Sequence, residues 1–174
     1  VVSVPLLEQG GTFVLNAQEI IKHAQDESQN IKLVYICSPN NPTGNAINQD
    51  EILSIAAALE DHAMVVLDET YAEFSEQGSL VSKLADTPNL IILRTLSKSY
   101  SMAGMRMGCF LSGDTDFIKL VRAKGLDAYP LPVECVNAAL HVLSPEIQQI
   151  AQENIQKLID SRKKLEESLK NSAE

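Results

Sequence analysis

The sequence has no tryptophan, few aromatic residues (5%) and no apolar stretch long enough to cross a membrane. Its uninterrupted apolar runs, such as 55–59 and 63–67, are far shorter than the ~20 residues that a membrane-spanning helix needs. The first residues lack the charged and apolar regions of a secretory signal. Cys37, Cys109 and Cys135 are an odd number at wide spacing, which predicts neither a disulfide framework nor a zinc site. We therefore expect a soluble, reduced, cytoplasmic protein.

Positive charge is also scarce. The 14 Lys and Arg residues face 23 Asp and Glu, for a net charge of −9, and the basic residues form no stripe. Because a nucleic-acid backbone is bound by concentrated positive charge, we expect no nucleic-acid partner. Since the apolar runs are too short to span a bilayer, we also expect no membrane partner. His23, His62 and His141 are scattered without a second ligand at metal spacing, so we expect no metal site.

Short apolar runs alternate with helical patterns along the 174 residues, of which 45% are hydrophobic. The runs lack the in-and-out alternation of half-exposed strands, which is typical of parallel strands buried on both faces. The fold expected is therefore α/β, with a three-layer αβα arrangement and a mostly parallel sheet. The predicted strands are Val1–Leu6, Lys32–Cys37, Ala63–Asp68, Leu90–Thr95 and Met107–Leu111.

Helix starts are indicated by Asn16 and Asn48, each three residues before a Glu, a variant of the capping box. Further helices are expected over residues 114–125, 132–143 and 145–171. The connection between the last two strands is too short for an ordinary helical crossover, so that pair is predicted to be antiparallel.

Three segments that follow predicted strands carry candidate chemistry, since ligands bind at the carboxyl ends of strands in open α/β sheets. Ser38-Pro-Asn-Asn-Pro-Thr-Gly44 is a stiff turn that could hold an amide in place, or an ordinary strand-to-helix turn. Asp68 ends a buried apolar run three residues before Tyr71; it either brings a carboxylate to the sheet edge or caps a helix. In the segment from Arg94 to Gly108, Lys98 lies among hydroxyl residues and Arg106 could clamp a phosphate; the alternative is a polar hairpin.

Together these motifs resemble the class I/II aminotransferase family, pyridoxal-phosphate enzymes of fold type I, over about residues 1–143. Their order and spacing carry the resemblance. Within the family the sequence is most similar to the histidinol-phosphate branch. The matching segments are Asn40-Asn41 before Pro-Thr-Gly, Asp68-Glu-Thr-Tyr71-Ala-Glu-Phe74, Arg94-Thr-Leu-Ser-Lys98, Ala103-Gly-Met-Arg106-Met-Gly108 and Tyr129-Pro-Leu131.

The resemblance implies a role for each of these positions. Lys98 corresponds to the lysine that forms a Schiff base with the cofactor and then moves protons. Asp68 corresponds to the carboxylate that pairs with the protonated pyridine nitrogen. The remaining cofactor contacts implied are Asn41 and Tyr71 at the ring oxygen, with Thr95, Ser97 and Arg106 at the phosphate.

The implied reaction is transamination between L-histidinol phosphate and 2-oxoglutarate, giving imidazole acetol phosphate and glutamate. The implied partners are small amino and keto acids and a second subunit of a homodimer, to which Tyr129 would contribute across the interface. An aromatic aminotransferase, a carbon–sulfur lyase or a phosphothreonine decarboxylase would keep the same cofactor residues. A non-catalytic module that retains the fold is a further alternative.

The family's upstream phosphate loop and its arginine for the substrate carboxylate have no counterpart in this sequence. We therefore expect residues 1–143 to form part of a cofactor-binding large domain. Residues 144–174 are expected to form a long helix leading towards a small domain. The chain is expected to be a piece of a longer protein, inactive by itself.

Overall fold

A computed structural model describes residues 1–125 and 131–172. The chain divides into two units, each described by itself below. The first comprises residues 1–95 and 108–130, and the second comprises residues 96–107 and 131–174.

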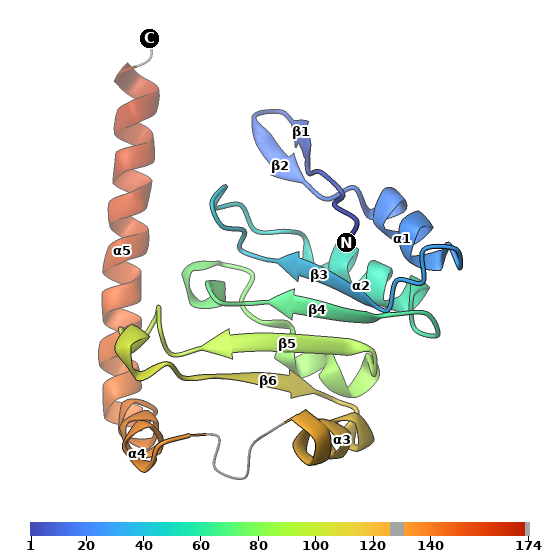
Figure 1. Ribbon diagram of the computed structural model, residues 1–174. Helices are drawn as coiled ribbons and strands as arrows, with labels where there is room; N and C mark the ends of the chain where they lie inside the picture. Colours follow the sequence, from blue (N-terminus) through green and yellow to red (C-terminus); the bar gives the residue numbers. More distant parts are fainter. Residues whose placement is uncertain (126–130, 173–174) are drawn as a thin grey trace. The chain divides into compact units, whose positions relative to one another are not determined.

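The first unit is built on a four-stranded sheet, shown in Figure 1, in the order β3-β4-β5-β6. Its strands are β3 (Leu33–Cys37), β4 (Met64–Asp68), β5 (Leu90–Thr95) and β6 (Gly108–Ser112). The pairs β3–β4 and β4–β5 are parallel and β5–β6 is antiparallel, which confirms the predicted α/β class with one antiparallel strand.

One face of this sheet carries the core. Residues that share a face because they pair across the strands, such as Ile36 with Leu67 and Leu67 with Ile92, are buried together. Apolar side chains from two helices, α1 (Ala17–Gln25) and α2 (Gln49–Ala58), belong to the same cluster. The helical members include Ala24, Ile52, Ile55 and Ala56.

Both predicted asparagine caps are present. The Asn16 side chain accepts a hydrogen bond from the backbone N–H of Glu19 at 3.3 Å, as a capping box requires. Asn48 accepts instead from the N–H of Asp50 at 2.8 Å, one residue earlier than its spacing predicted. Either bond satisfies a backbone donor that the first helical turn leaves without an intrahelical partner.

The predicted strand at Val1–Leu6 is wrong. These residues form no strand; the chain pairs only from β1 (Leu7–Gln9) and β2 (Thr12–Val14), an antiparallel hairpin that turns at Gly10 and Gly11. Both glycines have positive φ, as a tight hairpin turn requires. The apolar composition of residues 1–6 favoured a strand, but a strand also needs a partner for its backbone, and these residues have none in the described structure.

Short 3₁₀ helices and one α-helix complete the first unit: η1 (Ala72–Phe74), η2 (Leu80–Asp86) and α3 (Thr115–Gly125). The second unit contains η3 (Ala103–Met105), α4 (Val133–Val142) and α5 (Pro145–Ser172), with α4 in contact with α5. The three C-terminal helices agree with the ranges predicted from the sequence. Among the described helices, none is both long and apolar enough to cross a membrane.

Candidate active site

The turn after β3 is held by its own polar residues. The buried Ser38 hydroxyl accepts the N–H of Ile47 at 2.9 Å, which fixes the start of the turn against the chain that leaves it. Across the turn, the N–H of Gly44 donates to the carbonyl of Asn40 at 2.8 Å, and Gly44 adopts a φ of +76° that favours glycine. Asn41 lies within this hydrogen-bonded turn; that the turn holds its amide for a ligand stays a prediction.

Asp68 ends β4 in register with Cys37 at the end of β3, so the two side chains share one face of the sheet. Its Oδ1 accepts the Thr70 N–H at 2.9 Å and the Thr70 hydroxyl at 2.5 Å, and its Oδ2 accepts the Tyr35 hydroxyl. Partial burial pushes the pKa of Asp68 upwards, but the hydrogen bonds from Thr70 and Tyr35 outweigh burial and hold it below its ordinary value. Asp68 is therefore a carboxylate at neutral pH.

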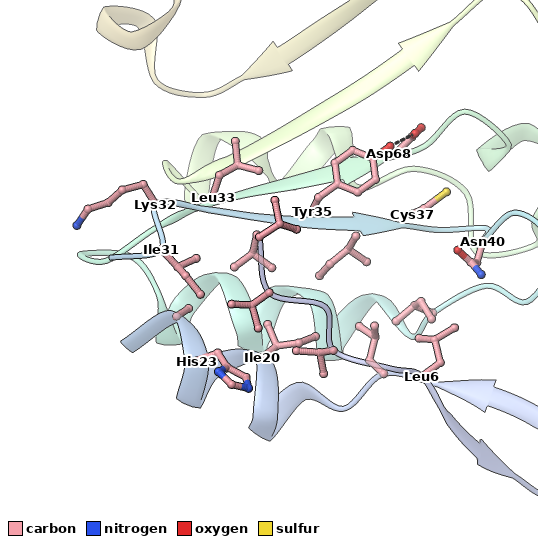
Figure 2. A pocket seen from close by; sticks show the side chains of 18 of the residues that line it. Leu6, Ile20, His23, Ile31, Lys32, Leu33, Tyr35, Cys37, Asn40 and Asp68 are labelled. Atoms are coloured by element: carbon pink, nitrogen blue, oxygen red, sulfur yellow. Dashed lines mark hydrogen bonds between the residues drawn. The ribbon is translucent and has the colours of Figure 1, made fainter. Parts of the chain in front are cut away.

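Asn41 and Tyr71 meet on this side of the sheet, where the Asn41 amide Nδ2 donates to the Tyr71 hydroxyl at 3.3 Å. Both side chains and Asp68 line one cavity of about 980 Å³, which extends along β3 towards the first residues of the chain. Figure 2 shows this cavity from close by, with Tyr35 and Cys37 on β3, Asn40 just after that strand, and Asp68 of β4 beside the Tyr35 ring. Three of the predicted residues, Asn41, Asp68 and Tyr71, thus line the same cavity.

The other predicted residues lie at the end of β5 and in the loop after it. Thr95 is the last residue of that strand and pairs with Gly108 across the antiparallel ladder. Ser97, Lys98 and Arg106 lie in the loop 96–107, which belongs to the second unit. That these three side chains meet Asp68 and Asn41 stays a prediction.

The loop 96–107, which contains Lys98, has a defined local structure. The N–H of Leu96 donates to the carbonyl of Met107 at 3.3 Å, closing the base of the loop. Arg106 adopts a left-handed backbone with φ of +52°, and its guanidinium donates to the Ala103 carbonyl at 3.0 Å. A non-glycine residue in this region is uncommon, and such residues cluster at functional sites.

Tyr129, predicted to act across a subunit interface, lies outside the described residues.

Two polar contacts at this site were not predicted. Tyr35 lies inside a strand, and only its spacing of two residues from Cys37, which places it on the same face as Asp68, could have indicated it. Thr70 follows Asp68 by two residues, the spacing of an Asx turn, and a search for such turns would have found it.

A buried ion-pair network adjoins Asp68. Glu69 is only 2% exposed, and its carboxylate accepts from Arg94 at 3.2 Å, from the Leu80 N–H at 2.8 Å and from the Ser79 hydroxyl at 2.5 Å. Arg94 also pairs with Glu73. Burial lowers the pKa of Arg94, but the carboxylates of Glu73 and, to a smaller extent, Glu69 raise it by more than burial lowers it. The net pKa is above the ordinary value, so the guanidinium remains charged. The network anchors the chain that follows β4 to β5.

Comparison with known proteins assigns the chain to a protein family. Residues 1–173 match the family model "Aminotransferase class I and II". The chain belongs to the class I and II aminotransferase family. Among its relatives is histidinol-phosphate aminotransferase 1 of Pasteurella multocida, 37% identical over 158 residues, which are 91% of this chain and 43% of the relative.

Solved structures agree with that assignment. Histidinol-phosphate aminotransferase of Sinorhizobium meliloti, in complex with pyridoxal-5'-phosphate, matches with a TM-score of 0.75 and 28% identity. That match covers 94% of this chain and 42% of the other. L-threonine-O-3-phosphate decarboxylase of Porphyromonas gingivalis matches with a TM-score of 0.62 and 25% identity, over 78% of this chain and 39% of the other. The chain spans less than half the length of these relatives.

Pyridoxal phosphate is the cofactor of this aminotransferase family. The donor set of the first unit fits its ring. A carboxylate, Asp68, would suit a protonated pyridine nitrogen, and the Asn41 amide and the Tyr71 phenol beside it would be donors for a ring oxygen. Among the described residues, no cluster of His, Cys, Asp and Glu could hold a metal ion.

Proposed function

We propose that the full-length protein is a pyridoxal-phosphate-dependent histidinol-phosphate aminotransferase of histidine biosynthesis. It would act in the cytoplasm as a homodimer and exchange the amino group of L-histidinol phosphate with 2-oxoglutarate. The observation that carries the proposal is the meeting of Asn41, Asp68 and Tyr71 in one cavity, in a chain 37% identical to such an enzyme.

Each residue has a separate task. Asp68 holds a proton at the pyridine nitrogen, because an ionised carboxylate stabilises the positive charge there. Asn41 and Tyr71 donate to the ring oxygen and so orient the ring. When bound, the cofactor withdraws electrons from the substrate's α-carbon.

The loop after β5 supplies the remaining groups of the proposal. Lys98 would hold the cofactor covalently before substrate binds; once the substrate amine has displaced it, the freed Lys98 amine would carry the proton that leaves the substrate α-carbon, a task that suits an amine in a hydroxyl-rich loop. Arg106, with the hydroxyls of Thr95 and Ser97, binds the phosphate, since a guanidinium can donate to two oxygens at once.

The residue assignment is tested by fixing the cofactor in place. Borohydride reduction of the loaded full-length protein, followed by peptide mapping, is expected to put the pyridoxyl group on Lys98. Lys98→Ala should abolish the labelling, whereas Lys119→Ala, which removes an exposed lysine paired with Asp116, should leave it unchanged. A label on any other lysine would contradict the assignment.

The substrate is tested separately, because the solved decarboxylase shares this fold. Full-length enzyme is incubated with L-histidinol phosphate and 2-oxoglutarate, or with O-phosphothreonine alone. Glutamate formed in the first mixture supports the proposal. Carbon dioxide released in the second, without glutamate in the first, would identify a decarboxylase instead.

A further inference from the structure

We propose that Tyr35 is a positioning residue of the active site: its hydroxyl holds the Asp68 carboxylate in the orientation in which Oδ2 meets the pyridine nitrogen of the cofactor. The inference rests on the proposed function and adds a residue to it. Tyr35 touches neither the reacting atoms nor the substrate in this proposal, and acts only through Asp68.

Strand geometry places the hydroxyl where it is needed. Residues two apart on a strand point to the same face, so Tyr35 shares a face with Cys37, and Cys37 is in register with Asp68. The two-residue step is about 6.6 Å along the strand, close to the length of a tyrosine side chain. The phenol therefore lies along the sheet and ends at the carboxylate, as the dashed line in Figure 2 shows.

The two carboxylate oxygens have different partners. Oδ1 is occupied twice by Thr70, through its N–H and its hydroxyl. Oδ2 accepts the Tyr35 hydroxyl, and because a carboxylate oxygen has two lone pairs, a second position on Oδ2 can face the cofactor. Thr70 alone would tether one oxygen; with Tyr35 holding the other, rotation of the carboxylate is blocked.

The Tyr35 hydroxyl is directed at the Asp68 carboxylate. Partial burial and this bond also raise the pKa of Tyr35, so the phenol keeps its proton and remains a donor.

The test measures cofactor affinity rather than turnover. Pyridoxal phosphate is titrated into the full-length apoprotein and binding is followed by visible absorption, for wild type, Tyr35→Phe, Asp68→Asn and the double variant. Tyr35→Phe should raise the Kd about three- to tenfold, as expected for a partly exposed hydrogen bond to a charged group. In the Asp68→Asn background the same substitution should change the Kd less than twofold, because the two residues act as one unit.

The control is Leu33→Ala, a truncation two residues away on the same face of β3, which should leave the Kd within twofold of wild type. If Tyr35→Phe leaves the Kd unchanged, or if its effect is the same with and without the Asp68 carboxylate, the positioning role is wrong while the proposed function stands. If Asp68→Asn itself leaves the Kd unchanged, the assignment of Asp68 fails, and the role of Tyr35 fails with it.

Discussion

At the scale of single residues, Asp68 couples the site to pH. Its pKa is lower in the folded protein than the ordinary carboxyl value of about 3.9, so the folded state binds a proton less readily than the unfolded state. The stability that Asp68 contributes is therefore fully present above about pH 4 and is lost as the pH falls through the folded pKa. Because the carboxylate is partly exposed, solvent screening limits its contribution to less than about 1 kcal/mol.

This predicts how an uncharged variant behaves. The difference in unfolding free energy between wild-type and Asp68→Asn full-length apoprotein should be larger at pH 6 than at pH 3. Urea unfolding at the two pH values measures it. A difference that is independent of pH, or that grows as the pH falls, would show that the folded pKa of Asp68 is not depressed.

A second residue-scale prediction concerns the buried network beside Asp68. Glu69→Gln removes the negative charge that pairs with Arg94. It also replaces one acceptor oxygen by an NH2 group, which cannot accept hydrogen bonds from the surrounding donors, the Ser79 hydroxyl and the Leu80 N–H. Breaking a largely buried pair in this way should cost about 2–4 kcal/mol of unfolding free energy, measured by urea unfolding. The control is Asp116→Asn, which breaks a pair whose side chains are 75% and 87% exposed and should cost under about 0.5 kcal/mol. Equal losses would contradict the structural role of Glu69.

The candidate site residues that the sequence indicated in the first unit lie at or just after strand ends, and their roles stay predictions. Asn41, Asp68 and Tyr71 stand where a buried apolar run gives way to polar residues, and that change is visible in one dimension. Tyr35 was missed because its contact with Asp68 joins residues 33 positions apart on different strands. Nothing in the sequence near Tyr35 gives the register of β3 against β4, on which the contact depends.

At the scale of elements, the antiparallel pairing of β5 with β6 was predictable because the loop between them is short. The strand predicted at Val1–Leu6 is wrong because the apolar composition of these residues indicated burial but gave no information on a backbone partner. Composition reports what a segment would bury, while pairing depends on the rest of the sheet.

Packing between elements also explains one glycine. A Cβ atom at Gly113, just after β6, would lie 1.9 Å from the carbonyl oxygen of Leu84 in η2, so the backbone of one element must move. Gly113→Ala should therefore destabilise the protein by about 2–3 kcal/mol, an overpacking cost. Gly104→Ala is the matched control, since its Cβ would meet nothing within 4 Å. Thermal unfolding of the two full-length variants compares them, and a Gly113→Ala melting temperature equal to that of Gly104→Ala would refute the clash.

At the scale of the whole molecule, the chain accounts for 43% of the length of its Pasteurella relative. Several large apolar side chains are exposed on it, among them Leu33 and Tyr35 on β3 and a stripe on α5 comprising Ile150, Leu158, Leu165 and Leu169. Exposed apolar side chains gathered on one element are typical of surfaces that another part of a protein covers.

The proposed homodimer gives the last prediction. Tyr129 directly precedes the first of two prolines in Asp127-Ala-Tyr-Pro-Leu-Pro132. The composition of this stretch favours an extended, stiff backbone that could hold an aromatic ring in a neighbouring active site. Tyr129→Ala in the full-length enzyme should then lower activity severely. If the single variant is as active as wild type, Tyr129 contributes to neither subunit's site.

Mixing two inactive variants shows which subunit's site Tyr129 serves. In a heterodimer of Lys98→Ala and Tyr129→Ala subunits with shared sites, one site inherits both lesions and the other inherits neither. Random exchange puts half of the subunits into such heterodimers, and half of their sites are intact, so about one quarter of wild-type activity should return. If Tyr129 serves its own subunit, every site in the heterodimer keeps one lesion and mixing restores nothing. Gel filtration of the mixture, with one variant tagged, verifies that subunits have exchanged, so that a lack of recovered activity reports on the site and not on the mixing.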